Sequence, residues 1–268
     1  MLSHKKGLDL DAATGLIDLP LFARATARTP SGGMVSTARR EATVLLSARA
    51  ILDEIPGDFV ETGTNTGGTA VLMLKTLLAL DTGTPRKHWY GFDSFQGLPD
   101  VVDGDRASNN NDGIGRAVLP TAVSSSAQGE AGMMKTSQSS LRVNLRKNAV
   151  DDWSIIHIGK GWFNTTLPKA HVKQISFLRL DGDLFVSTWE GLHYLYPKLS
   201  AGGYVYVDDY GSFEGCKRAV NLYRQRHNIT SRMWPVFERP PILAPGMKAM
   251  KGTEGELEYK VEAVWWRK

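Results

Sequence analysis

Aspartates follow two apolar, β-rich runs of this sequence. Residues 175–180 are followed by Asp181, and residues 204–207 are followed by Asp208 and Asp209. Parallel strands are buried on both faces and collect ligands at their carboxyl ends, and neighbouring strands lie about 4.8 Å apart. Burial and like-charge repulsion oppose ionisation of three carboxylates in one small volume, and a hard divalent cation with oxygen ligands would relieve both. We therefore expect a Mg²⁺ site here, the alternative being that the aspartates cap the following turns.

A glycine-rich turn follows another strand-like run. Residues 58–62, which include Glu61, lead into Gly63 and Gly67 and then into an apolar helix. A strand, a glycine turn and a helix N-terminus form the layout of an adenosine-cofactor site, because glycines let the backbone approach the ligand. The turn matches neither the dinucleotide GxGxxG spacing nor the phosphate-binding GxxxxGK[ST] motif. Asp93 ends the next strand, where it would accept hydrogen bonds from ribose hydroxyls or simply form a turn.

S-adenosylmethionine fits these two features together better than NAD does. A site for a hard metal beside an adenosine cofactor suits the methylation of a hydroxyl group. The adenosine cofactor would lie over the first two strands, with the metal beside it at the fourth and fifth.

The rest of the chain must position these residues, and it alternates strand-like with helix-like segments. Apolar residues with helical spacing alternate with short β-rich runs, which predicts an α/β fold with a doubly wound, mostly parallel sheet. We expect seven strands, the last two forming an antiparallel pair at the edge. Strands are expected at 58–62, 88–92, 154–158, 175–180 and 204–207, and more weakly at 233–237 and 259–266; helices are expected at 36–55, 69–80, 139–148, from Ser187 or Thr188, and at 213–228.

Two segments stand apart from this alternation. Residues 1–33 mix polar and apolar positions and end in a Pro-Ser-Gly-Gly loop signal, so we expect an N-terminal arm that covers the domain or mediates self-association. Residues 34–268 would form the main domain, a size that suits one large α/β unit. Within it, residues 99–136 are rich in Asn, Asp, Gly and Ser, which is typical of a lid, an acceptor-binding loop or disorder.

Composition excludes several other classes of protein. The net charge of +4 over 268 residues is small, and no basic stripe alternates with aromatic residues, so nucleic-acid binding is not expected. No run reaches about 18 apolar residues, so no membrane span is expected. The single cysteine, Cys216, rules out an internal disulfide and a cysteine-based zinc site. Aspartates interrupt the N-terminal segment where a signal peptide would be apolar, and a cytoplasmic protein is expected.

The motifs, taken in order, resemble those of the macrocin-type, metal-dependent sugar O-methyltransferases of macrolide and aminocoumarin biosynthesis. The resemblance extends from about Met34 to Tyr223, and the spacing between motifs is nearly constant. The matching motifs are Glu61-Thr62-Gly63 with Gly67-Gly68, Asp93-Ser94-Phe95-Gln96-Gly97-Leu98-Pro99, Gly161-Trp162-Phe163, residues 178–183 with Ser187-Thr188, residues 195–199, and Asp208-Asp209-Tyr210.

This resemblance implies a Rossmann-like fold and the transfer of a methyl group from S-adenosylmethionine to a hydroxyl of a small-molecule acceptor. The acceptor would be a sugar or a glycosylated natural product. Asp183 would be the general base, and Trp162 would flank the adenine. The implied cofactor-binding residues are Glu61, Thr62, Gly63, Gly67, Asp93, Ser94, Trp162 and Asp181, and the implied Mg²⁺ ligands are Asp181, Asp208 and Asp209.

One departure and several alternatives accompany this interpretation. Family members usually carry a Trp-Arg pair inside the glycine turn, whereas Asn65-Thr66 occupy that place here. A methyltransferase for catechols or other phenols would use the same chemistry on a different acceptor. A non-catalytic relative that only binds S-adenosylmethionine is a further alternative, and a Rossmann-type oxidoreductase is disfavoured by the missing GxGxxG. The N-terminal arm is compatible with a homo-oligomer.

Overall fold

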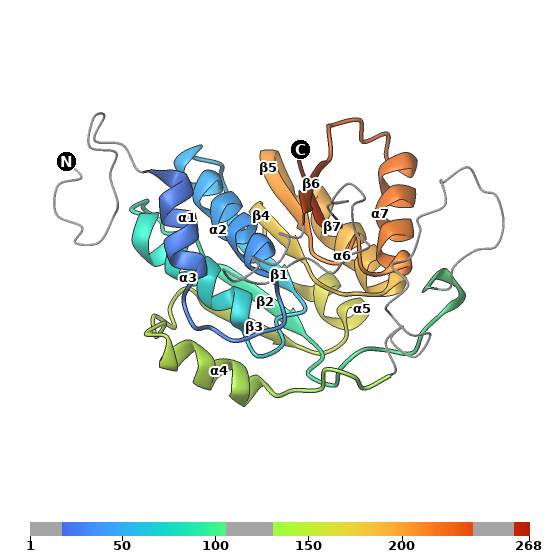
Figure 1. Cartoon of the computed structure of the whole chain (residues 1–268), viewed down its shortest axis with the longest axis horizontal. Coiled ribbons are helices and arrows are strands. Elements are labelled where there is room, and N and C mark those ends of the chain that lie inside the picture. The colour runs from blue at the N-terminus through green and yellow to red at the C-terminus, as the bar shows by residue number, and fades with distance from the viewer. Residues whose placement is uncertain (1–17, 106–130, 238–259) are drawn as a thin grey trace, which may run out of the picture.

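A mixed sheet forms the centre of the computed structural model, which describes residues 18–105, 131–237 and 260–268. Within these residues seven strands pair in the order β3-β2-β1-β4-β5-β7-β6 (Figure 1). Strands β1 to β5 are parallel, whereas β7 is antiparallel to both β5 and β6. The predicted doubly wound α/β sheet with an antiparallel C-terminal pair at its edge is therefore confirmed.

The elements follow the predicted alternation of strands and helices. The strands are β1 (Asp58–Thr62), β2 (Trp89–Asp93), β3 (Ile156–Lys160), β4 (Ile175–Leu180), β5 (Leu199–Val207), β6 (Trp234–Phe237) and β7 (Val261–Arg267). The helices are α1 (Leu19–Ala27), α2 (Thr37–Leu52), α3 (Gly68–Leu80), α4 (Gln138–Lys147), α5 (Phe163–Thr166), α6 (Phe185–Leu195) and α7 (Glu214–Arg226), with short 3-10 turns η1 (Asp103–Asp105), η2 (Leu167–Lys169) and η3 (Tyr196–Lys198).

Both faces of the parallel sheet are buried, which explains why its strands are almost continuously apolar. Alternate strand residues point to opposite faces. Phe59 and Phe177 pack with α2, α3 and α4 on one face, whereas Val60 and Leu178 pack with α6 and α7 on the other. Figure 1 shows the two helical layers on either side of the sheet. All residues of β4, in the middle of the sheet, are buried.

Several predicted boundaries differ from the structure; the largest difference is at β5, which begins at Leu199 and not at 204. At two other boundaries a polar contact explains the difference. Strand β3 begins at Ile156 and not at 154, because Ser154 bonds the Asp152 carboxylate in a turn. Helix α6 begins at Phe185, ahead of the predicted caps Ser187 and Thr188. The Asp105 carboxylate accepts the backbone N–H of Phe185, so a residue eighty positions away caps this helix.

The segment expected to be an N-terminal arm contains a helix. Helix α1 lies on α2 and α3 through Phe22, Ala23 and Ala27, which pack against Val44, Ala48, Leu72 and Leu80. Arg40 of α2 then holds the loop after α1, because its guanidinium donates to the carbonyls of Ala27 and Thr29 and to the Ser31 hydroxyl. The described part of the arm therefore covers the domain.

Two other predictions touch on the undescribed residues. Of the predicted loop 99–136, residues 106–130 lie outside the described part of the chain, as do residues 1–17 of the arm. Among the described residues, no helix has the length and apolar character that crossing a bilayer requires.

The packing of α1 can be tested with a matched pair of substitutions. Phe22 is buried under α1, whereas Leu21 on the same helix is 39% exposed. We expect Phe22→Ala to lower the free energy of unfolding by about 3 kcal/mol through lost burial and a residual cavity, and Leu21→Ala by less than about 1 kcal/mol. Urea denaturation followed by tryptophan fluorescence measures both. Equal effects of the two substitutions would show that α1 is not docked through Phe22.

Candidate active site

Two adjoining cavities lie at the carboxyl ends of the parallel strands. The first, called here the Trp162 cavity, is lined by residues that follow β1, β2 and β3. The second, called here the Asp209 cavity, is lined by residues that follow β1, β4 and β5 and by the start of α2. Asn65, Met134, Asp181 and Asp183 line both cavities, which therefore adjoin at these four residues.

The glycine turn lies against the end of β4. Gly63 has a positive φ of 77°, and a Cβ there would lie 1.6 Å from the carbonyl oxygen of Asp181. Gly67 (φ 85°) is the N-cap of α3, and a Cβ there would meet the Leu141 side chain at 2.3 Å. Only glycine allows the close approach to backbone at Gly63, and the positive φ of both residues also favours glycine. The approach at Gly63 places the turn beside Asp181.

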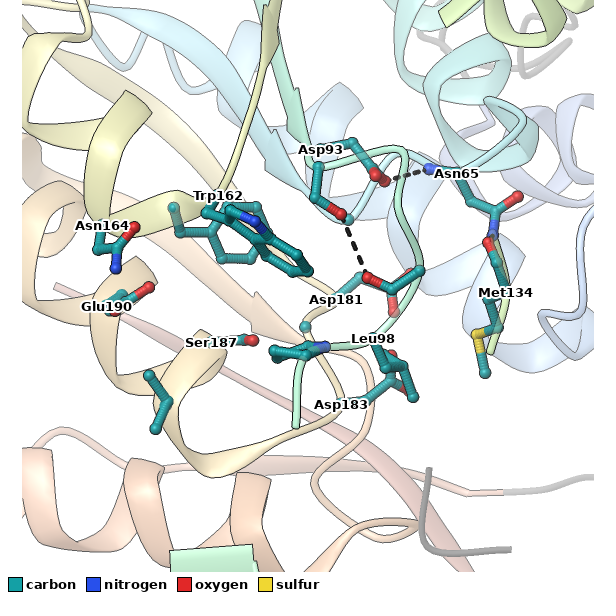
Figure 2. Close-up of a pocket in the computed structure, with 17 residues that line it drawn as sticks. Asn65, Asp93, Leu98, Met134, Trp162, Asn164, Asp181, Asp183, Ser187 and Glu190 are labelled. Atoms are coloured by element: carbon teal, nitrogen blue, oxygen red, sulfur yellow. Dashed lines mark hydrogen bonds between the residues drawn. The ribbon is translucent and has the colours of Figure 1, made fainter. Parts of the chain in front are cut away.

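Asp93 holds the glycine turn to the end of β2. One carboxylate oxygen accepts the Asn65 backbone N–H at 2.8 Å, and the other accepts the Phe95 N–H at 2.6 Å. Burial raises the pKa of Asp93, and these backbone donors oppose that rise. Ser94 bonds the backbone of the following turn at Gln96 and Gly97. Figure 2 shows the Asp93 side chain at the Trp162 cavity, with its bond to Asn65 dashed.

The three predicted metal ligands meet at one point. Leu180 of β4 is in register with Val207 of β5, so Asp181 and Asp208 leave the sheet side by side. One oxygen from each of Asp181, Asp208 and Asp209 lies within 4.8 Å of the others. This all-oxygen donor set is the kind that hard divalent cations prefer.

A buried arginine lies beneath this cluster, and sequence reasoning missed it. Arg179 is fully buried, and its guanidinium contacts Asp181 at 2.7 Å, Asp208 at 2.6 Å and Glu61 at 3.4 Å. It is in register with Glu61 and Tyr206 on the adjacent strands and therefore shares a sheet face with them. The sequence does contain a signal that could have identified Arg179: it is a charged residue inside an apolar strand, two positions before an aspartate, and therefore on the same side of the strand.

A second arginine reaches the cluster from α2. Arg39 contacts Asp208 at 2.6 Å and Asp209 at 3.9 Å, and its Nε lies 3.7 Å from Glu262 of β7. Sequence reasoning missed this residue too, because nothing in its spacing relates it to the strand ends. Two guanidinium groups thus supply part of the countercharge that the sequence argument assigned entirely to a metal.

Negative charge still exceeds positive charge in this cluster. Burial and the neighbouring carboxylates of Asp183, Asp181 and Asp208 raise the pKa of Asp209 well above its usual range. Burial also raises the pKa of Asp208, and Arg179 and Arg39 oppose that rise. A divalent cation would relieve the remaining repulsion, so the residues present fit such an ion, which Asp181, Asp208 and Asp209 would hold.

Asp183, the predicted base, lies beside the cluster in an unusual backbone conformation. Its φ is 57°, and its backbone N–H donates to an Asp209 carboxylate oxygen at 3.2 Å. Burial, together with the charges of Asp181 and Asp208, raises the pKa of Asp183 to about 8. A carboxylate with a raised pKa is suited to accept a proton near neutral pH.

Three predicted cofactor residues do not line either cavity. Glu61, Thr62 and Gly67 lie behind the cavity walls. Glu61 is fully buried, accepts a hydrogen bond from the Thr69 hydroxyl and has its pKa raised to about 7 by burial. Their predicted binding roles stay predictions. The other predicted cofactor residues, Gly63, Asp93, Ser94, Trp162 and Asp181, all line the Trp162 cavity.

The structural role of Arg179 yields a prediction about stability. Arg179→Met leaves Glu61, Asp181 and Asp208 without their buried counter-ion, and we expect a loss of about 3–5 kcal/mol in the free energy of unfolding. Loss of the positive charge raises the carboxylate pKa values in the folded state, which then binds more protons than the unfolded state. The variant's stability should therefore fall as pH rises, and its deficit should be larger at pH 8 than at pH 5.5.

The control for this prediction is Arg267→Met. Arg267 is 51% exposed and lies 3.6 Å from Asp53, so its loss should cost less than about 1 kcal/mol. Denaturant titrations at the two pH values measure both variants. A deficit for Arg179→Met that does not depend on pH would contradict the charge-balance explanation.

Comparison with known proteins places this geometry in a family. Residues 23–238 match the macrocin O-methyltransferase (TylF) family. The demethyldecarbamoylnovobiocin O-methyltransferase of Streptomyces niveus is 39% identical over 181 residues, which are 68% of this chain and 63% of that protein. The 8-demethyl-8-(2,3-dimethoxy-alpha-L-rhamnosyl)-tetracenomycin-C 4'-O-methyltransferase of Streptomyces olivaceus is 33% identical over 186 residues, which are 67% of this chain and 62% of that protein. These matches span less than two thirds of either relative.

A solved structure agrees with the sequence comparison over a longer range. The O-methyltransferase NovP superposes with a TM-score of 0.70 at 26% identity, covering 94% of this chain and 99% of that one. The calicheamicin methyltransferase CalS11 shares the fold, with a TM-score of 0.53 at 20% identity over 93% of this chain and 82% of that one. Because the family match covers residues 23–238 and the Streptomyces niveus relative is 39% identical over 68% of this chain, this chain belongs to the macrocin O-methyltransferase (TylF) family.

Proposed function

We propose that this chain transfers a methyl group from S-adenosylmethionine to a hydroxyl of a sugar on a glycosylated natural product, with the help of a bound Mg²⁺. Membership of the family supports methyl transfer to oxygen. The name of the Streptomyces olivaceus relative, which specifies a rhamnosyl compound, supports a sugar hydroxyl as the acceptor. The small-molecule acceptor would enter the Asp209 cavity.

The observation that carries this proposal is the junction between the two cavities. Asp181 and Asp183 line both of them, so a cofactor in the Trp162 cavity and an acceptor in the Asp209 cavity would meet at these two side chains. Asp93 would accept hydrogen bonds from the ribose hydroxyls of the cofactor. The glycine turn at Gly63 would lie close to the sulfur end of the cofactor. Holding two reactants in a fixed orientation supplies much of the rate enhancement in such transfers.

Asp183 is the residue placed to move the proton. In its ionised form it would accept the proton of the acceptor hydroxyl; a pKa of about 8 makes that form a stronger base and shifts it to slightly alkaline pH. When bound, Mg²⁺ supplies Lewis acidity that lowers the pKa of an acceptor hydroxyl. Arg179 and Arg39 keep the Asp208 carboxylate in place, since each of its oxygens accepts from one guanidinium.

Replacing Asp183 tests its role as base. Asp183→Asn keeps the size of the side chain but cannot accept the proton, so we expect turnover to fall by about 10²–10⁴-fold. The affinity for S-adenosylhomocysteine, measured by calorimetry, should stay within about twofold, because no bond to the cofactor is assigned to Asp183. Asp151→Asn, at an exposed position, is the matched control. Undiminished methylation of a glycoside acceptor by Asp183→Asn would remove Asp183 from the mechanism.

The metal is tested by binding as well as by activity. Protein stripped with EDTA should lose methylation of glycoside acceptors and regain it with Mg²⁺. In calorimetry, Asp209→Asn should abolish the heat of Mg²⁺ binding while S-adenosylhomocysteine still binds. Full activity in EDTA would refute the metal, whereas the absence of any S-adenosylhomocysteine binding to wild-type protein would favour a relative that has lost the reaction. Methylation of catechols but not glycosides would instead assign a phenolic acceptor.

A further inference from the structure

One carboxylate in the Trp162 cavity has no role in the mechanism above. Glu190 of α6 and Asn164 of α5 line this cavity together with Trp162. The residues that line this cavity are arranged in the order of the strands in the sheet. Asn65 comes after β1, Asp93 ends β2, and Trp162 and Asn164 come after β3. Figure 2 shows the same sequence, with Asn65 on one side, Asn164 and Glu190 on the other, and Trp162 between. Glu190 thus lies at the end of the cavity away from the glycine turn.

This position corresponds to one part of an adenosine cofactor. With the sulfur near Gly63 and the ribose on Asp93, the base must extend toward Trp162 and the residues after β3. Trp162 presents an aromatic ring there, and aromatic rings stack on bases without distinguishing them. Recognition of a particular base therefore requires a polar group at its edge.

Glu190 has the free acceptor capacity that such recognition needs. It is half-buried, and burial raises its pKa while the Asn164 backbone N–H bonds its carboxylate and opposes that rise. Among the described residues, no lysine or arginine forms an ion pair with Glu190. A carboxylate has two oxygens with about four acceptor positions, so the single bond from Asn164 leaves most of them available.

We propose that Glu190 recognises the adenine of the cofactor by accepting a hydrogen bond from its 6-amino group. This inference rests on the proposed function, since it assumes that S-adenosylmethionine occupies the Trp162 cavity. A carboxylate that accepts from the amino group selects adenine against a base with a carbonyl oxygen at the same position, because two acceptors would then face each other. Glu190 is thus a specificity-determining residue.

The test compares two ligands whose bases differ at position 6, where the change from an amino group to an oxygen also places a hydrogen on N1. S-adenosylhomocysteine carries the 6-amino group, and S-inosylhomocysteine carries an oxygen there. Calorimetry with wild-type protein, Glu190→Gln and Glu54→Gln gives the ratio of the two dissociation constants for each protein. Glu54 is exposed and precedes β1 at the opposite end of the strands, so it controls for the change in charge. The ratio does not depend on the fraction of correctly folded protein, and glutamine retains an acceptor for the Asn164 N–H.

We expect the wild type and Glu54→Gln to prefer S-adenosylhomocysteine by at least about tenfold. In Glu190→Gln the ratio should fall by at least about fivefold, because the amide can donate to the carbonyl oxygen of the inosine base. Equal affinity of the wild type for both ligands, or an unchanged ratio in Glu190→Gln, would overturn the assignment while leaving the methyltransferase proposal intact. Failure of the wild type to bind either ligand would overturn the proposed function and the assignment with it.

Discussion

The balance of charge around Arg179 is the constraint on which the rest of the site depends. This guanidinium lies inside a fully buried strand and contacts three carboxylates from three neighbouring strands, Glu61, Asp181 and Asp208. An unpaired charge at such depth would cost several kcal/mol, so each member of the network requires the others. The network also joins the strand that leads into the glycine turn to the two strands that end in the carboxylate cluster. A single electrostatic unit thus underlies both cavities.

The parallel topology provides the geometry for that unit. Strands β1, β4 and β5 are adjacent and parallel, so their carboxyl ends lie at one edge of the sheet. The close contact between Gly63 and the Asp181 carbonyl then brings the glycine turn to the carboxylates with no space for a side chain between them. Helices from distant parts of the chain complete the walls, with Arg39 contributed by α2 and Glu190 by α6. The candidate site is therefore concentrated at the carboxyl ends of the central strands.

The two cavities differ in chemical character, as the proposed methyl transfer to a hydroxyl requires. The Trp162 cavity has an aromatic wall and polar groups spaced along its length, as a nucleoside needs, whereas the Asp209 cavity gathers carboxylates and arginine. Asp183 lies where they adjoin, with its pKa raised by burial and by neighbouring charge. In its backbone conformation, of positive φ, it donates its own N–H to Asp209. Asp183, the proposed base, is thus tied directly to one of the residues that would hold the metal.

The sequence by itself determined the alternation of strands and helices, the class of the sheet and the convergence of Asp181, Asp208 and Asp209. These features depend on local signals: the spacing of apolar residues within each segment, and polar residues directly after apolar strands. It did not determine the countercharge. In the sequence, Arg179 is a single charged residue within an apolar strand, and Arg39 lies on a helix far away in the chain. Only the packed structure brings both to the carboxylates. The cap of α6 by Asp105 was likewise decided by tertiary contact. Contacts between residues far apart in the chain depend on how helices dock against the sheet, and no spacing rule within one segment encodes that docking.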